Sequence, residues 1–138
     1  MNIFDIMGPV MVGPSSSHTA GAARIGYIGR KLLGFQPARA DIGLHGSFAA
    51  TGPGHGTDKA IVAGLLGMGP DDPRIPFSFQ LAKEAGLEVN VHPVTLRDAH
   101  PNTAVMTLTG SRGRTVEVSA SSLGGGRIRV NSIDGLEA

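Results

Sequence analysis

The spacing of apolar residues changes along this chain, and that change constrains the fold more than any other feature of the sequence. Over much of the first 85 residues apolar side chains recur every three or four positions, whereas from Leu87 onward they recur every second position. The first spacing is typical of an amphipathic helix, and the second of a strand with one buried face. A chain that contains both is predicted to form an α/β domain.

The expected elements follow from these spacings and from the glycines that interrupt them. Helices are predicted over residues 19–33, 57–66 and 77–85, each followed by a glycine that can end it. Strands, the last four largely antiparallel, are predicted over residues 38–47, 87–92, 103–109, 115–120 and 127–131. The segment 110–113 is typical of a hairpin loop. We therefore expect a mixed sheet of about five strands flanked by two or three helices.

Glycine is abundant, with 21 residues, and three glycines fall inside the first predicted helix, at Gly21, Gly26 and Gly29. Each costs about 1 kcal/mol of helix stability relative to alanine. This cost is understandable if another element packs closely against that helix, where a side chain would not fit.

Length and charge narrow the class of protein. At 138 residues the chain is long enough for one domain with a real core, and its net charge of +1 gives no electrostatic reason to expect a nucleic acid or membrane partner. No run of about 18 apolar residues is present, and the start of the chain carries Asp5 without a basic segment, so no signal peptide is predicted. We expect a cytoplasmic protein. The absence of cysteine excludes disulfides and any cluster or zinc site held by thiolates of this chain.

The first candidate site is the stretch from Gly13 to Thr19, in front of the first predicted helix. It contains the hydroxyl and imidazole side chains of Ser15, Ser16, Ser17, His18 and Thr19. Hydroxyl groups at this position can cap the helix, and its free N–H groups can bind a carboxylate or phosphate. A capped turn with no further role remains the simpler alternative.

The second candidate is the glycine-rich segment from Gly54 to Asp58. His55 lies between two glycines, so a ligand can approach its ring, and imidazole is suited to proton transfer near neutral pH. Thr57 and Asp58 can cap the helix that follows, and Asp58 could orient an imidazole. The alternative is a loop with an incidental histidine. No Gly-Lys-Ser/Thr sequence is present, so this is not a phosphate-binding P-loop.

Three further histidines are less clear. His100 is followed by Pro101 and Asn102, so its position at a loop edge is restricted. His45 ends a predicted strand, where a solvated or a site position is possible, and His92 lies in an alternating strand that favours the surface. No Ser-His-Asp triad and no zinc-protease spacing can be assembled, so we predict no metal bound by this chain.

These motifs, taken together and in this order, resemble the β subunit of the iron–sulfur-dependent L-serine dehydratases. The resemblance covers essentially the whole chain. The motifs that carry it are Phe4-Asp5, Gly8-Pro9, Gly13–Thr19, Gly46-Ser47, Thr51-Gly52, Gly54–Ala60, His100-Pro101-Asn102 and Gly124-Gly125-Gly126.

The resemblance implies a lyase that deaminates L-serine to pyruvate and ammonia without pyridoxal phosphate. In this family the cysteines of the α subunit hold a four-iron–four-sulfur (4Fe-4S) cluster, which agrees with a β chain that has no cysteine. The resemblance also implies a fold similar to the allosteric substrate-binding domain of phosphoglycerate dehydrogenases. Residues 1–138 would form a single β domain followed by a C-terminal ACT domain.

Roles for individual residues follow from the same resemblance. His55 would be the base that removes the α-proton, with His18 and His100 lining the site. The substrate would be held by Ser15, Ser16, Ser17 and Thr19, while Thr57 and Asp58 would support His55. The implied partners are the α subunit and L-serine, within a homo- or hetero-oligomer that serves amino-acid degradation and gluconeogenesis.

Two alternatives belong to other classes of function. The domain could be a regulatory module that binds serine or another anion without turning it over, or an assembly domain that mainly holds the α subunit. His55 and His100 argue against a purely regulatory site, because such a site has no need of a base.

Overall fold

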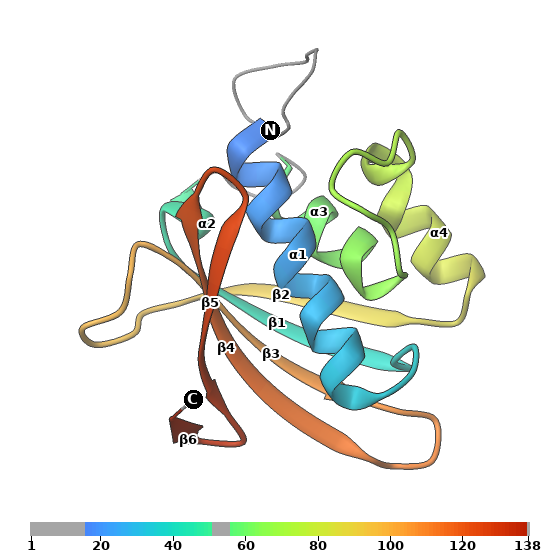
Figure 1. Cartoon of the computed structure of the whole chain (residues 1–138). Helices are drawn as coiled ribbons and strands as arrows, with labels where there is room; N and C mark the ends of the chain where they lie inside the picture. Colours follow the sequence, from blue (N-terminus) through green and yellow to red (C-terminus); the bar gives the residue numbers. More distant parts are fainter. Residues whose placement is uncertain (1–15, 51–55, 138) are drawn as a thin grey trace.

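The computed structural model describes residues 16–50 and 56–137. Its centre is a six-stranded sheet in the order β2-β1-β3-β4-β5-β6 (Figure 1). The strands are β1 (Arg39–Gly46), β2 (Glu88–Val94), β3 (Asn102–Thr109), β4 (Thr115–Gly124), β5 (Arg127–Ile133) and β6 (Leu136–Glu137). β2 runs parallel to β1 and the other neighbours are antiparallel. The predicted mixed sheet is confirmed, with the two-residue β6 in addition.

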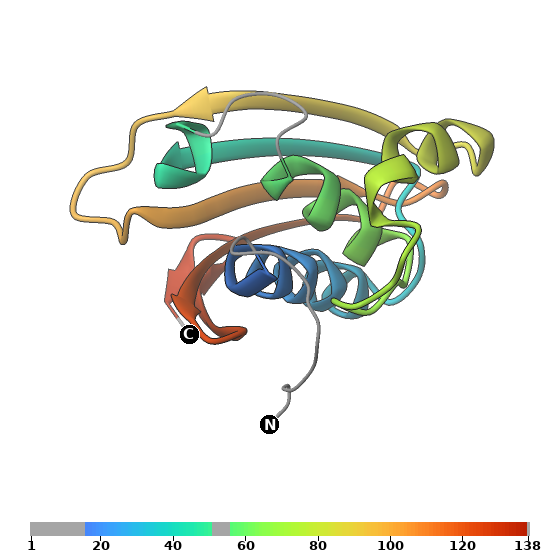
Figure 2. The same ribbon diagram turned by 90° about the horizontal axis from the view of Figure 1, so that it is seen from above.

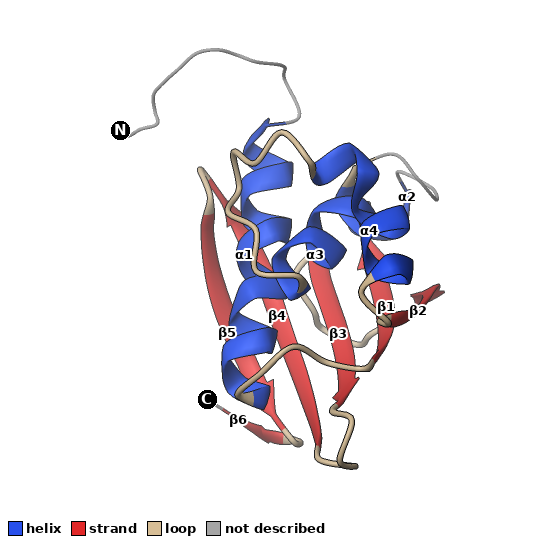
Figure 3. Cartoon of the chain, turned by 90° about the vertical axis from the view of Figure 1, so that its right-hand side faces the viewer, coloured by secondary structure: helices blue, strands red, loops and turns tan. Residues whose placement is uncertain are grey.

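The helices that pack on the sheet cover one of its faces (Figures 2 and 3). They are α1 (Ser16–Leu33), α2 (Ser47–Ala50), α3 (Thr57–Leu65), the 3-10 turn η1 (Ile75–Phe77) and α4 (Ser78–Glu84). The core lies between the helices and the sheet and includes the fully buried Phe48, Ile25, Ile61 and Met106. The three predicted helices are present, whereas the four-residue α2 was not predicted. No helix among the described residues is long and apolar enough to span a bilayer.

The glycines of α1 allow close packing, as their positions predict. A Cβ atom on Gly26 would lie 2.0 Å from the carbonyl oxygen of Ile61 in α3, and one on Gly64 would lie 2.1 Å from the carbonyl oxygen of Ala23. A Cβ atom on Gly21 would lie 2.1 Å from Ser122 Oγ in β4. α1 is therefore packed closely against both neighbours, backbone against backbone at α3 and backbone against side chains at the sheet.

Two hairpins organise the antiparallel part of the sheet. The predicted hairpin loop joins β3 and β4, where the N–H of Gly110 donates to the carbonyl oxygen of Arg114 over 2.7 Å. Gly125 and Gly126 form the turn between β4 and β5 with φ angles of 63° and 79°. Positive φ at both central residues is what a tight two-residue hairpin of this kind requires.

Candidate functional site

The described segments with predicted site residues lie at one end of the sheet. α1 and α3 both begin at this end, β1 ends there, and the loop before β3 lies beside it (Figures 1 and 2). Contacts support the arrangement, because the N–H of Ser47 donates to the carbonyl oxygen of Pro101 over 2.8 Å. The Ala20 Cβ lies 3.5 Å from the position a Cβ would take on Gly126, which brings the β4–β5 turn to the start of α1.

The serine-rich stretch is described only in part. α1 begins at Ser16, three residues before the predicted start, so the hydroxyl-rich stretch forms the first turn of the helix rather than preceding it. Ser15 and the side chains of Ser16, Ser17 and His18 lie outside the described residues. Thr19 is half-buried.

The start of α3 differs from the prediction. We expected Thr57 and Asp58 to cap this helix, but the N-cap residue is Gly56, with φ of 123° and no side-chain cap. Thr57 and Asp58 instead lie within the first turn and are 4% and 3% exposed. The Asp58 carboxylate accepts the N–H of Lys59 over 2.8 Å, which satisfies one free donor of that turn. His55, the predicted base, lies outside the described residues.

His100 is half-buried immediately before β3, and its ring orientation is defined. The N–H of Asn102 donates to His100 Nδ1 over 3.0 Å. A backbone N–H can only donate, so Nδ1 carries no proton and the neutral ring carries its proton on Nε2. In this arrangement His100 offers a hydrogen-bond donor to a ligand at Nε2, rather than a free lone pair for proton abstraction.

The other two described histidines differ from each other. His45 is half-buried at the end of β1, and its Nδ1 accepts the N–H of Leu96 over 3.0 Å. His92 lies on the edge strand β2 with its Nε2 at 3.1 Å from Asp41 Oδ1, and these side chains are 44% and 41% exposed. The predicted surface position of His92 is confirmed, and such an exposed pair contributes little stability.

Two polar atoms at this end were not predicted as site atoms. Asn102 Oδ1 and Ser122 Oγ are buried and have no hydrogen-bond partner among the described residues. Buried polar groups are nearly always paired, so these atoms leave hydrogen-bonding capacity for a ligand or water. Asn102 could have been suspected from its place after His100 and Pro101. Ser122 could have been suspected only because it is a polar residue at an inward-facing position of a strand in which apolar and polar residues alternate.

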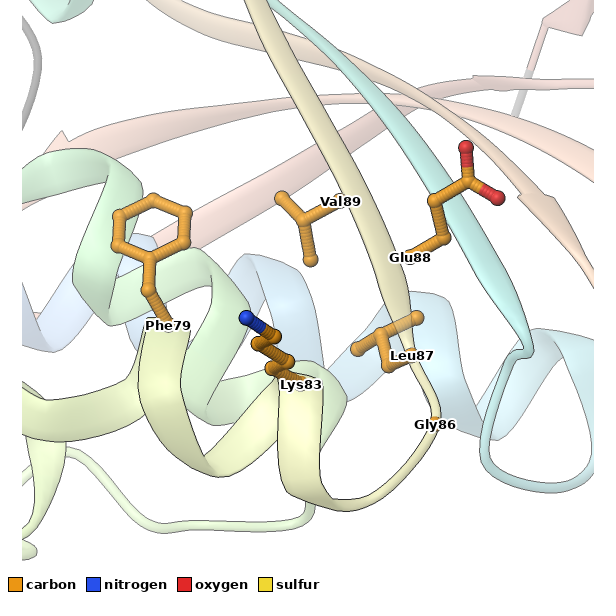
Figure 4. A pocket seen from close by; sticks show the side chains of 6 residues that line it. All are labelled: Phe79, Lys83, Gly86, Leu87, Glu88 and Val89. Atoms are coloured by element: carbon orange, nitrogen blue, oxygen red, sulfur yellow. The ribbon is translucent and has the colours of Figure 1, made fainter.

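Two other features of the described surface lie outside the predicted motifs. A pocket of about 400 Å³ lies between α4 and the start of β2, lined by Phe79, Lys83 and Val89 among others (Figure 4). Because β2 is parallel to β1, this pocket is at the opposite end of the sheet from His45. Hydrogen bonds from Arg74 lower the pKa of the Asp72 carboxyl to about 2, in the exposed turn before η1.

A metal site does not emerge from the described part of the chain. Among the side chains that the structure describes, no three His, Asp or Glu gather closely enough to hold an ion. The whole sequence lacks cysteine, so the residues present do not fit an iron–sulfur cluster held by thiolates of this chain.

This chain is similar to known proteins of one family. Residues 2–84 match the family model of the serine dehydratase beta chain. The chain is 46% identical over 136 residues to a probable L-serine dehydratase, beta chain, of Bacillus subtilis, covering 99% of this chain and 61% of that relative. It is also 46% identical over 134 residues to the L-serine dehydratase, beta chain, of Peptoniphilus asaccharolyticus, covering 96% of this chain and 60% of the relative.

A longer relative, whose name does not specify a beta chain, has a lower identity to this chain. The L-serine dehydratase of Mycobacterium bovis is 30% identical over 160 residues, which cover 98% of this chain and 34% of that protein. The chain thus spans about three fifths of the two beta chains and about one third of this longer relative.

Proposed function

This chain belongs to the serine dehydratase beta chain family, and we propose that it supplies substrate-binding and proton-transfer residues for the conversion of L-serine to pyruvate and ammonia. The observation that carries the proposal is the gathering of family motifs at one end of the sheet. The loop before β3, which contains His100, and the starts of α3 and α1 lie there together, although they are far apart in the sequence.

The partner in this proposal is an α subunit that carries the 4Fe-4S cluster. This chain has no thiolate with which to hold such a cluster, so the cluster would have to come from the partner. When bound, a cluster with an open iron supplies a Lewis acid for the leaving hydroxyl of serine. The residues of this chain would then bind the remainder of the substrate and transfer its proton.

The proposed roles follow the chemistry of β-elimination. His55 takes the proton from Cα, and the electron pair of that C–H bond forms the double bond between Cα and Cβ. The hydroxyl leaves Cβ with the electron pair of the C–O bond. The resulting aminoacrylate tautomerises to an imine, which water hydrolyses to pyruvate and ammonia. The first turn of α1, with Thr19 and the preceding serines, binds the carboxylate, because free N–H groups and the positive end of the helix dipole favour an anion. Asp58 and Thr57 support His55 from the buried start of α3.

His100 is proposed to act as a donor to the substrate through Nε2–H, since its Nδ1 is occupied by the N–H of Asn102. His100→Ala is then expected to lower kcat/KM by about 10- to 100-fold, the range of a hydrogen bond to a charged group. His100→Gln keeps an N–H donor and should retain most of the activity, with an unchanged pH profile. If His100 were the base, the glutamine variant would be as inactive as the alanine variant in a pyruvate assay.

The proposal is tested by reconstitution. We expect the purified chain alone to produce no pyruvate from L-serine, and to become active under anaerobic conditions with a cluster-loaded α partner. Turnover by the chain without the partner would contradict the assignment of the Lewis acid to another subunit. Binding of serine without turnover with any α partner would instead indicate a regulatory domain.

A further inference from the structure

The loop of residues 95–101 between β2 and β3 carries His100 and is held at both ends. At its start the N–H of Leu96 donates to His45 Nδ1 over 3.0 Å. Near its end the carbonyl oxygen of His100 accepts from Thr103 Oγ1 over 2.7 Å, and the carbonyl oxygen of Pro101 accepts from the N–H of Ser47 over 2.8 Å. The position of His100 therefore depends on groups outside the loop.

The hydrogen bond from Thr103 to His100 continues into a chain of buried hydrogen bonds, and the donor in each of them can be identified. Thr103 and Ser121 are both 0% exposed, and their hydroxyl oxygens lie 2.7 Å apart. Thr103 uses its single hydroxyl hydrogen on His100, so Ser121 must donate to Thr103. Ser121 in turn accepts from Asn131 Nδ2 over 2.9 Å. This end of the loop is fixed by the sheet itself.

The start of the loop is held by a side chain from β1. β2 ends at Val94, and two residues later His45, which lies 51 positions earlier in the sequence, accepts the N–H of Leu96. Because that N–H can only donate, Nδ1 of His45 is unprotonated, in the same arrangement as His100. Nothing else in the proposed chemistry uses His45.

We propose that His45 is a positioning residue for His100, acting through Leu96 and the loop of residues 95–101. The inference rests on the proposed function for the role of His100 as a substrate donor, but the structural link itself does not. Without the acceptor on His45, the N–H of Leu96 loses its partner and the start of the loop is released. His100 then keeps its contacts with Asn102 and Thr103, but the residues before it are no longer held, so its ring loses part of the restraint on its position relative to the starts of α1 and α3.

The test compares three variants of the whole chain and holds a fourth in reserve. His45→Leu removes the acceptor at similar bulk, and His45→Asn retains one, because its Oδ1 takes about the position of Nδ1. His92→Leu is the matched control, a histidine on the neighbouring strand whose ring contacts Asp41 of β1. His45→Ala removes the same acceptor without branching and serves if the leucine variant does not fold.

The first readout is NMR of the chain alone. In His45→Leu we expect the amide hydrogen of Leu96 to exchange about tenfold faster, the effect of one lost hydrogen bond, and the ring nitrogens of His100 to shift. His45→Asn and His92→Leu should match the wild type. Unchanged exchange at Leu96 and unchanged His100 signals in His45→Leu would overturn the inference, whether or not the complex is active.

The second readout is turnover with the α partner. His45→Leu should lower kcat/KM about tenfold, as partial loss of the His100 contact predicts, and His45→Asn should restore it. Shifted His100 signals with unchanged turnover would overturn the functional half of the inference. An inactive wild-type complex would contradict the proposed function but leave the link between His45 and His100 standing.

Discussion

Replacing His55 by alanine is expected to lower the rate of pyruvate formation by about 100- to 10,000-fold, the range that general acid–base catalysis contributes. The physical reason is that no water molecule placed by chance can replace a base held next to the α-proton. Binding of L-serine should be little affected, so the loss should fall on kcat. The measurement is steady-state pyruvate formation by the reconstituted complex under anaerobic conditions.

The pH profile gives an independent check on the same residue. A base works only when it is unprotonated, so wild-type activity should rise with pH through the imidazole range, about pH 6 to 7. A flat profile across that range would contradict the assignment of a histidine base. His92→Ala is the control, because His92 is exposed on the edge strand and should leave the rate unchanged. If His55→Ala remained active, another residue would have to be the base.

Replacing Gly64 by alanine is expected to cause a large loss of stability, about 3 kcal/mol in the free energy of unfolding, at the upper end of overpacking effects. The new Cβ atom would lie 2.1 Å from the carbonyl oxygen of Ala23 and 2.6 Å from the backbone nitrogen of Tyr27. Both are backbone atoms, so rotating a side chain cannot relieve the overlap and the two helices must separate. The helix propensity of alanine offsets about 1 kcal/mol of this loss.

The control for this prediction is Gly69→Ala. Gly69 is exposed after the end of α3, and a Cβ there would meet only Asp71 Oδ1 at 3.5 Å, an ordinary contact. Its effect should stay within about 0.5 kcal/mol, as for most surface substitutions. Urea unfolding followed by circular dichroism measures both. Equal midpoints for Gly64→Ala and the wild type would show that α1 and α3 are not in backbone contact.

Much of the fold could be predicted because the spacing of apolar residues within a segment indicates whether that segment is a helix or a strand. The alternation in 103–109 and 115–120 predicted β3, β4 and the hairpin between them. The glycines at 21, 26 and 29 predicted a close neighbour for α1. The parallel partner of β1 was not predicted, because a period of two says which face of a strand is buried and nothing about the strand beside it.

The sequence motifs named candidate site residues, but the geometry of those that the structure describes could not be predicted from them. His100 could be recognised from the proline and asparagine that follow it, but its ring orientation depends on a backbone N–H that no sequence pattern reveals. The predicted capping of α3 by Thr57 and Asp58 was wrong, because both residues lie inside the first turn and Gly56, with a φ of 123°, is the N-cap. The contact between His45 and Leu96 joins residues 51 positions apart, so it required the structure.

The position of β1 between two strands that follow it in the sequence also affects how the chain acquires its structure during synthesis. Both strands that flank β1 are made later, since Arg39 pairs with Glu88 on one side and with Thr109 on the other. Contacts between such distant residues form slowly, because a long loop must close before they contribute. A nascent chain that stalls before Thr109 would therefore expose the edge of β1, and unpaired strand edges promote aggregation.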